Sequence, residues 1–214
     1  NKIGMLIADP AVRNVIGQPR MSFSFKDIMD SGKILLVSVP QGKLGIEKSA
    51  ILGSLVLTLV HLTALERIDT SHRPPFHCYL DEGHHFGSSM LAEMLSGVGK
   101  FQVSLTIAHQ YLHQLSPELR HALIGTVGTM VAFRIGAIDA ETMAPEFAFE
   151  ALDDPLPQLR PYAAYAKTDR TYMLDMPEIT RPVHAFDFRT ASRRQYAGQR
   201  SQVEERIDRF IRGT

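Results

Sequence analysis

The chain has 214 residues, of which 44% are hydrophobic and 21% charged, and its formal net charge is zero. The length allows one substantial core, and the balanced charge excludes a global field that would drive the whole molecule onto nucleic acid or a membrane. A single cysteine, Cys78, excludes an internal disulfide framework and fits a reducing compartment.

The first predicted elements are a strand and a long helix. The β-branched run "KILLVSVP", residues 33–40, predicts a strand that Pro40 ends. The sequence from Glu47 to Ile68 predicts a helix that is apolar on nearly every face, and we expect it to be deeply buried. Its apolar run is shorter than a bilayer span and is closely flanked by charges, so we expect no membrane contact.

Strands and helices then alternate. Buried strands are predicted at residues 76–80, 103–108 and 127–136. Helices are predicted between them, one from a cap at Ser88 to Val98 and one from Pro117 to Ile124. A short helix capped by Asp139 is expected to run towards Phe147. This alternation predicts an α/β fold with a mostly parallel sheet covered on both faces.

The pattern changes after Pro155. Residues 159–167 and 170–176 predict an antiparallel hairpin that turns at Thr168 and Asp169. The last helix is predicted to present one apolar face, made of Val203, Ile207, Phe210 and Ile211. Residues 181–214 carry eight arginines against four acidic residues, so they predict a basic tail with an amphipathic helix. That tail could contact phosphates or could simply be a solvated helix end.

Polar side chains follow three of the predicted strands. Asp81 and Glu82 come directly after residues 76–80, Gln110 follows residues 103–108, and Arg134 lies late in residues 127–136. Ligands of open parallel sheets bind beyond the carboxyl ends of the strands. Two acids, an amide and a guanidinium there suit nucleotide hydrolysis, with one acid holding a magnesium-bound water and the other polarising the attacking water. A plain solvated strand end is the alternative.

Rival chemistries are less well supported by the sequence. Zinc is suggested by a cluster of possible ligands, but adjacent strand residues point to opposite faces and one cysteine cannot make a thiolate-rich site. His109 and His113 have helical metal-ligand spacing without the glutamate of a metalloprotease motif. The possible zinc ligands are His77, Cys78, His84 and His85.

The phosphate-binding loop of a P-loop NTPase is missing. The pattern G-x-x-x-x-G-K-S/T does not occur in the sequence. Without that loop's backbone amides and lysine, tight binding of a triphosphate is hard to build.

Five consecutive blocks resemble one family. They are "FSFKDIMDSGKILLVSVPQGKLG", "ILGSLVLTLVHLTALER", "PPFHCYLDEGHHF", "MLSGVGKFQVSLTIAHQYLHQL" and "GTVGTMVAFRIGAIDAE". In order and spacing they look like the conjugative coupling ATPases of the TraG/TraD type, within the FtsK/HerA-like DNA pumps. The resemblance covers about residues 13 to 180 and implies a RecA-like three-layer sandwich that uses ATP and Mg²⁺ to move DNA as a homo-hexamer.

The resemblance assigns roles to particular residues. It implies that Asp81 and Glu82 are the Walker B pair, with Mg²⁺ held by Asp81 through water, and that Gln110 senses the γ-phosphate. Lys100 and Arg134 are the nucleotide-binding or trans-acting candidates. Residues 1–180 would be the C-terminal portion of the motor domain and residues 181–214 its tail, with the Walker A motif upstream of Asn1.

Two departures from the family stand in the sequence. Gly97 and Gly99 occupy the places of an expected acid and of an arginine finger, and only Lys100 matches there. The segment "EGHHF" replaces an aromatic-rich continuation after the acids.

The sequence therefore predicts the Walker B and sensor half of a DNA-translocating ATPase in conjugation or type IV secretion. We expect its partners to be DNA and the secretion machinery. We expect a cytoplasmic location, at the inner membrane through regions outside this sequence. The 214-residue chain alone is expected to be inactive. The alternative is a non-hydrolysing structural or interaction module derived from the same fold.

Overall fold

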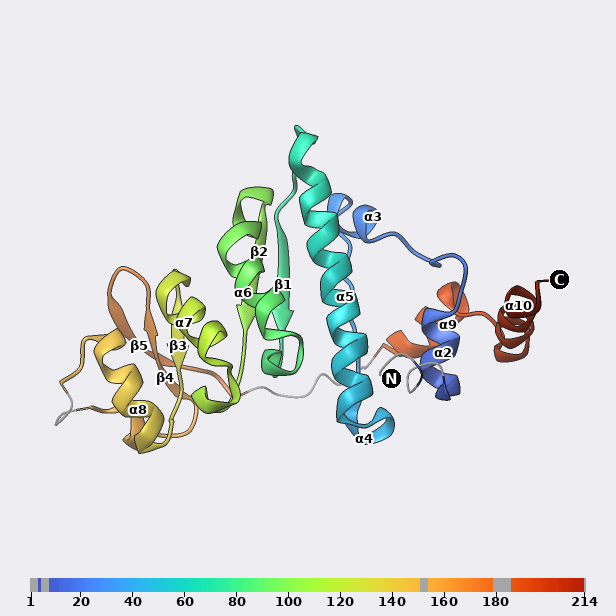
Figure 1. The fold of residues 1–214 in the computed structure, drawn as a ribbon. Helices are drawn as coiled ribbons and strands as arrows, with labels where there is room; N and C mark the ends of the chain where they lie inside the picture. The colour runs from blue at the N-terminus through green and yellow to red at the C-terminus, as the bar shows by residue number, and fades with distance from the viewer. Residues whose placement is uncertain (1–3, 5–7, 151–153, 179–185, 214) are drawn as a thin grey trace. The chain divides into compact units, whose positions relative to one another are not determined.

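A computed structural model describes residues 4, 8–150, 154–178 and 186–213 of the chain (Figure 1). The fold is mixed α/β and divides into two compact units. The first unit is Asn1–Phe76 with Val183–Thr214, and the second is His77–Pro182. The predicted domain boundary at residues 180 and 181 lies outside the described residues.

The first unit is helical in its described part. Its elements are α2 (Pro10–Ile16), α3 (Phe25–Asp30), α4 (Gln41–Leu44), α5 (Ile46–Glu66), the 3₁₀ turn η1 (Arg67–Asp69), α9 (Phe188–Tyr196) and α10 (Arg200–Arg212). Asp9 caps α2 and Ser24 caps α3, each accepting a backbone N–H of the first turn. Helix α10 packs on α2 through the buried Val203 and Ile207.

A fully buried arginine ties α3 to the end of α5. The Nε atom of Arg67 lies 3.2 Å from a carboxylate oxygen of Asp30, and its guanidinium donates to the carbonyl of Pro74 at 2.7 Å. A buried guanidinium needs such partners because desolvation of an unpaired charge is costly.

The prediction that residues 47–68 form a deeply buried helix is right about the helix and wrong about its burial. Only one stripe of α5 is buried, and it is lined by Ser49, Gly53, Leu57, Val60, Thr63 and Ala64. Leu55 and Leu62 are 43% and 49% exposed on other faces. Ile46–Asp69, with a mean hydropathy of 1.6, is long and apolar enough to cross a membrane by length and composition alone.

The predicted strand at residues 33–40 is not formed. The segment has no strand pairing in the structure, and Ile34 and Leu36 are 89% and 71% exposed. A strand requires a neighbour to satisfy its backbone groups, and the two small sheets formed by the described residues do not include this segment. The β-branched composition alone is therefore insufficient to form a strand.

The second unit contains both sheets, apart from Phe76 at the start of the first strand. Its strands are β1 (Phe76–Leu80), β2 (Val103–Ile107), β3 (Met130–Ala132), β4 (Ala163–Lys167) and β5 (Thr171–Asp175). Its helices are α6 (Ser88–Gly97), α7 (Pro117–Thr126) and α8 (Ala137–Met143), with the 3₁₀ turns η2 (Gly83–His85), η3 (Val98–Phe101), η4 (Leu112–Gln114), η5 (Ala144–Phe147) and η6 (Leu156–Gln158). Helix α6 packs against α7.

Strand pairing corrects the predicted sheet. Strands β1 and β2 form a parallel pair, whereas β3, β4 and β5 form a separate antiparallel sheet. The expectation of a mostly parallel sheet is therefore wrong for the described residues. The strand predicted over residues 127–136 shortens to Met130–Ala132 and pairs with β4, from Met130 opposite Lys167 to Ala132 opposite Tyr165.

Several local predictions are confirmed. Strand β1 has the predicted bounds, and β4 and β5 form the predicted hairpin, in which Lys167 pairs with Thr171. The helices predicted from Ser88 and Pro117 are present as α6 and α7, although the N-cap of α6 is Gly87 and that of α7 is Ser116. The last helix is present, but two of its four predicted face residues, Phe210 and Ile211, are 83% and 68% exposed.

The core of the second unit surrounds the antiparallel sheet. Its buried members come from β3, β4, α8, the two 3₁₀ turns η5 and η6, and the residue after η6, and Phe147 is its largest side chain. They are Met130, Ala132, Ala140, Phe147, Leu156, Leu159 and Ala163.

Candidate functional site

The parallel pairing of β1 with β2 brings two predicted site segments together. The N–H of Ala108 donates to the carbonyl of Leu80 at 2.9 Å, and the N–H of Gly83 donates to the carbonyl of Ala108 at 3.2 Å. The carboxyl ends of both strands therefore lie at one edge. Asp81 and Glu82 leave this edge from β1, and His109 and Gln110 leave it from β2.

Glu82 and Gln110 are in direct contact. The side-chain amide of Gln110 donates to Oε1 of Glu82 at 2.5 Å, although 28 residues separate them in the sequence. Glu82 has the left-handed backbone conformation, with φ 51° and ψ 43°, which is uncommon for a residue other than glycine. This conformation turns the chain into η2, and it places Gly83 against the end of β2.

Gly83 fits because it has no side chain. A Cβ atom at this position would lie 2.7 Å from Cγ2 of Ile107, the last residue of β2. Ile107 is β-branched and stands in a strand, so its methyl group has little freedom to move away. The close approach of the two chain segments therefore depends on glycine.

His84 lies beside the carboxylate of Glu82, and the ring of His85 packs against that of His84. Nδ1 of His84 lies 3.4 Å from Oε2 of Glu82, and the His84 side chain is only 11% exposed. The rings of His84 and His85 are 3.9 Å apart between centroids. Burial, and then the neighbouring His85, lower the pKa of His84, while Glu82 acts in the opposite direction. His84 is therefore neutral at pH 7.

His109 is held neutral in a similar way. Burial is the largest cause that lowers its pKa, followed by His84, against the opposing effects of Asp139 and Glu82. Its Nδ1 atom is buried without a hydrogen-bond partner. The site thus places neutral imidazoles around one carboxylate.

The segment after His109 is fixed by two side chains that the sequence did not identify as site residues. The amide oxygen of Gln114 accepts the N–H groups of Gln110 and Tyr111 at 3.3 and 3.1 Å. A carboxylate oxygen of Asp139 accepts the N–H of Leu112 at 3.1 Å. These bonds hold the loop that carries Gln110.

Asp139 does not have its predicted role. Gly136 is the N-cap of α8, and Asp139 lies within the helix, buried to 9% exposure. A buried aspartate needs a hydrogen-bond partner. The sequence does not indicate that this partner is the N–H of Leu112, which lies 27 residues away.

The remaining predicted site residues lie outside the contact between Glu82 and Gln110. Asp81 is exposed in the turn beside Glu82. Lys100 is exposed in η3, with its ammonium group 5.8 Å from the centroid of the Phe101 ring. Arg134 is exposed after β3, in the antiparallel sheet, so the predicted row of three neighbouring parallel strand ends is wrong.

Within the described part of the chain, no group of three or more histidine, cysteine, aspartate or glutamate residues is placed to hold a metal ion. His77 instead contacts Ser104 across β1 and β2, with 2.7 Å between Nδ1 and Oγ. Burial raises the pKa of the Cys78 thiol. Magnesium needs fewer protein ligands than zinc, because it keeps several waters and binds substrate phosphates. The exposed Asp81 carboxylate fits that requirement.

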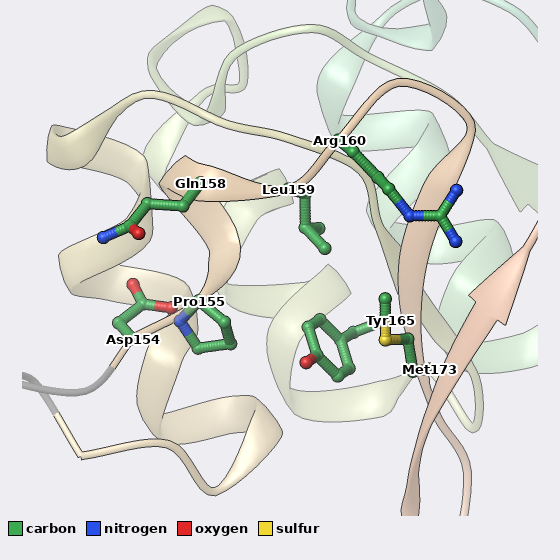
Figure 2. Close-up of a pocket in the computed structure, with 7 residues that line it drawn as sticks. All are labelled: Asp154, Pro155, Gln158, Leu159, Arg160, Tyr165 and Met173. Carbon is green, nitrogen blue, oxygen red and sulfur yellow. The ribbon is translucent and has the colours of Figure 1, made fainter.

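A cavity of about 510 Å³ opens beside the hairpin (Figure 2). Its charged groups already have partners: Asp154 accepts the N–H of Leu156 at 2.9 Å and Arg160 pairs with Asp175 at 2.5 Å. It shares no residue with the Glu82 and Gln110 site. It is lined by Asp154, Pro155, Gln158, Leu159, Arg160, Tyr165 and Met173.

Comparison with known proteins does not identify a family. The sequence matches no protein-family model, and no curated protein matches it.

The neutral histidines predict a pH dependence of stability. The folded-state pKa of His109 lies below its ordinary value of 6.5, so below pH 6.5 the unfolded chain takes up a proton that the folded chain refuses. The free energy of unfolding should fall as the pH is lowered through 6.5 towards the folded-state pKa. Urea unfolding of wild type and His109→Gln across this range measures the effect, and the variant should lose less stability. Equal losses in the two proteins would contradict the assignment.

Proposed function

We propose that this chain is the Walker B and sensor half of an ATP-driven, DNA-translocating motor of the conjugative coupling type. The observation that carries the proposal is the contact between Gln110 and Glu82 at the carboxyl ends of a parallel strand pair. A carboxylate that can accept a proton and an amide that can orient the attacking water are among the groups that nucleotide hydrolysis uses. The resemblance of the sequence blocks to the TraG/TraD type supports the same conclusion.

The roles follow from the chemistry of each side chain. Glu82 accepts a proton from the attacking water, and the amide of Gln110 orients both that water and the carboxylate. Asp81 would hold Mg²⁺ through a bound water, and the ion would neutralise charge on the phosphates. The neutral His84 and His109 leave the negative charge of Glu82 uncompensated. A carboxylate that is not neutralised by imidazolium remains a competent base.

The proposed motor needs a phosphate-binding loop from elsewhere in the full-length protein, since the 214 residues contain none. Exposed apolar residues of the first unit support the idea that further protein covers it. Ile34 and Leu36 in the unpaired segment, and Leu55 and Leu62 on α5, are all at least 43% exposed. Large apolar side chains that are exposed to this extent are the kind that a protein interface covers.

The proposal also includes the oligomeric state and the partners of the full-length protein. The full-length protein would act on DNA as a homo-hexamer at the cytoplasmic face of the inner membrane, with the conjugation or secretion machinery as its partner. A non-hydrolysing structural or interaction module is the second candidate. It is favoured by Gly97 and Gly99, which stand where the resembled family has an acid and its finger arginine. A Walker A motif in the full-length sequence would discriminate between the two.

The proposed role of Glu82 can be tested in the full-length protein. Glu82→Gln keeps the shape and hydrogen bonding but removes the base, so ATP should still bind while turnover falls by about 10² to 10⁴-fold. Asp81→Asn should instead weaken magnesium-nucleotide binding. Steady-state ATPase rates and separate nucleotide titrations measure both effects.

Glu118→Gln is the matched control, because Glu118 is an exposed carboxylate on α7 in the same unit. It should hydrolyse ATP like wild type. Equal rates for Glu82→Gln and an active wild type would refute the role of this acid. If wild type is inactive, Gly99→Arg is the informative variant, because nothing lies within 4 Å of a Cβ at this position. Restored hydrolysis would show that the rest of the site is intact.

The 214-residue chain by itself should bind ATP weakly or not at all. Asp81 and Glu82 repel a triphosphate unless magnesium bridges them, and no phosphate loop offsets that repulsion. Isothermal calorimetry with magnesium and ATP should show no binding in the micromolar range. A micromolar dissociation constant would mean that these residues hold the phosphates without a Walker A loop.

A further inference from the structure

Strand β5 forms an open edge of the antiparallel sheet in the second unit. The strand order is β3, β4, β5, so β5 has β4 on one side and, among the described residues, no strand on the other. The strand at the opposite edge, β3, is only three residues long, whereas β5 has five residues. An edge strand presents unpaired N–H and C=O groups, which makes it a template for pairing with another chain.

The pairing with β4 determines which backbone groups of β5 point outwards. The N–H of Met176, just after β5, donates to the carbonyl of Tyr162 at 2.7 Å. Hydrogen-bonded positions alternate along an antiparallel ladder, so Leu174 and Tyr172 are the next residues that bond to β4. The N–H and C=O groups of the residues between and beside them point away from β4. These residues, which we call the β5 edge, are Thr171, Met173 and Asp175.

The β5 edge lacks the features that keep the sheet edges of monomeric proteins apart, which are lysine, proline and β-bulges. The sequence of β5, TYMLD, contains neither lysine nor proline, and its register with β4 runs from Thr171 to Asp175 without a bulge. The charge of Asp175 is paired with Arg160 at 2.5 Å. Tyr172 and Met173 are 47% and 53% exposed, so apolar surface accompanies the outward backbone groups.

We propose that the β5 edge binds the β5 edge of a second copy of this chain, as an antiparallel strand pair with Met173 on the two-fold axis. In this register Thr171 lies opposite Asp175 of the second copy, and Tyr172 lies opposite Leu174 of the second copy. Each residue of the β5 edge then exchanges both of its backbone hydrogen bonds with the second copy. The two three-stranded sheets become one six-stranded sheet, and the two-fold axis closes the assembly at a dimer.

The β5 edge is complementary to itself in this register. Asp175 is the one charged residue of β5, and it faces Thr171 of the second copy, so no like charges are opposed. The exposed ring of Tyr172 gains an apolar cross-strand neighbour in Leu174. Met173 lines the cavity of about 510 Å³ beside Tyr165, so the methionine of the second copy has space on that face of the sheet (Figure 2).

This contact is separate from the proposed function. The β5 edge shares no residue with the site of Glu82 and Gln110, so the inference does not depend on ATP hydrolysis. A two-fold contact also differs from the contacts that would close a ring of six subunits. An extended segment of a different protein could pair with the same edge, but the second copy supplies a strand of equal length with a matching pattern of outward backbone groups.

Sedimentation equilibrium of the 214-residue chain over a range of protein concentrations tests the association. Wild type should show a reversible equilibrium between monomer and dimer. Met173→Lys should raise the dissociation constant of the dimer at least about tenfold, because two lysines would face each other across the axis. Val131→Lys is the matched control, since Val131 is 51% exposed and lies on β3 at the opposite edge of the same sheet. This control should dimerise like wild type.

Disulfide cross-linking tests the register. Tyr172 and Leu174 of the second copy would be a non-hydrogen-bonded pair with Cα atoms about 4.5 Å apart, which a disulfide can bridge. In a Cys78→Ala background, an oxidised mixture of Tyr172→Cys and Leu174→Cys chains should therefore form a linked dimer. Either variant alone should link much less, because its two cysteines would be diagonal neighbours about 7 to 8 Å apart.

Circular dichroism checks that each variant is folded. Three results would overturn the proposal: a wild type that stays monomeric at every concentration, equal weakening of the dimer by Met173→Lys and Val131→Lys, or cross-linking that is no stronger in the mixture than in either variant alone. A monomeric wild type would leave the β5 edge to a strand of a different protein.

Discussion

The backbone hydrogen bonds that join Leu80, Gly83 and Ala108 are the constraint on which the proposed site depends. They hold the ends of β1 and β2 in parallel, so two short polar segments separated by a whole helix meet at one edge. Gly83 makes the close approach possible, since a Cβ would lie 2.7 Å from the methyl group of Ile107. Without this pairing, Glu82 and Gln110 would not be brought into contact.

Two polar side chains hold the loop that follows β2. Gln114 and Asp139 accept backbone N–H groups of residues 110–112, which positions the amide of Gln110 against Glu82. The unusual left-handed conformation of Glu82 is consistent with a functional role, because such conformations cost free energy and persist where the surroundings hold them. Burial lowers the pKa values of His84 and His109, which favours their neutral forms beside Glu82.

The sequence predicts local features well and partnerships poorly. The bounds of β1, the hairpin of β4 and β5, and the placement of Glu82 near Gln110 follow from short patterns that the structure reproduces. The predicted strand at residues 33–40 is absent because a strand needs a neighbouring strand to pair with, which β-branched composition does not provide. The prediction that helix α5 is deeply buried is wrong, because apolar composition shows which side chains could be buried, whereas packing decides which of them are. The contact of Asp139 with Leu112 joins distant positions that no local pattern connects.

A double-mutant cycle on ATP hydrolysis by the full-length protein tests most directly whether Glu82 and Gln110 act as one unit. The four proteins are wild type, Glu82→Gln, Gln110→Ala and the double variant, each checked for folding. If the amide acts through the carboxylate and its water, the double variant should be about as slow as Glu82→Gln alone, because groups that act together are non-additive. Independent effects that multiply in the double variant, or a Gln110→Ala variant as fast as wild type, would contradict the account.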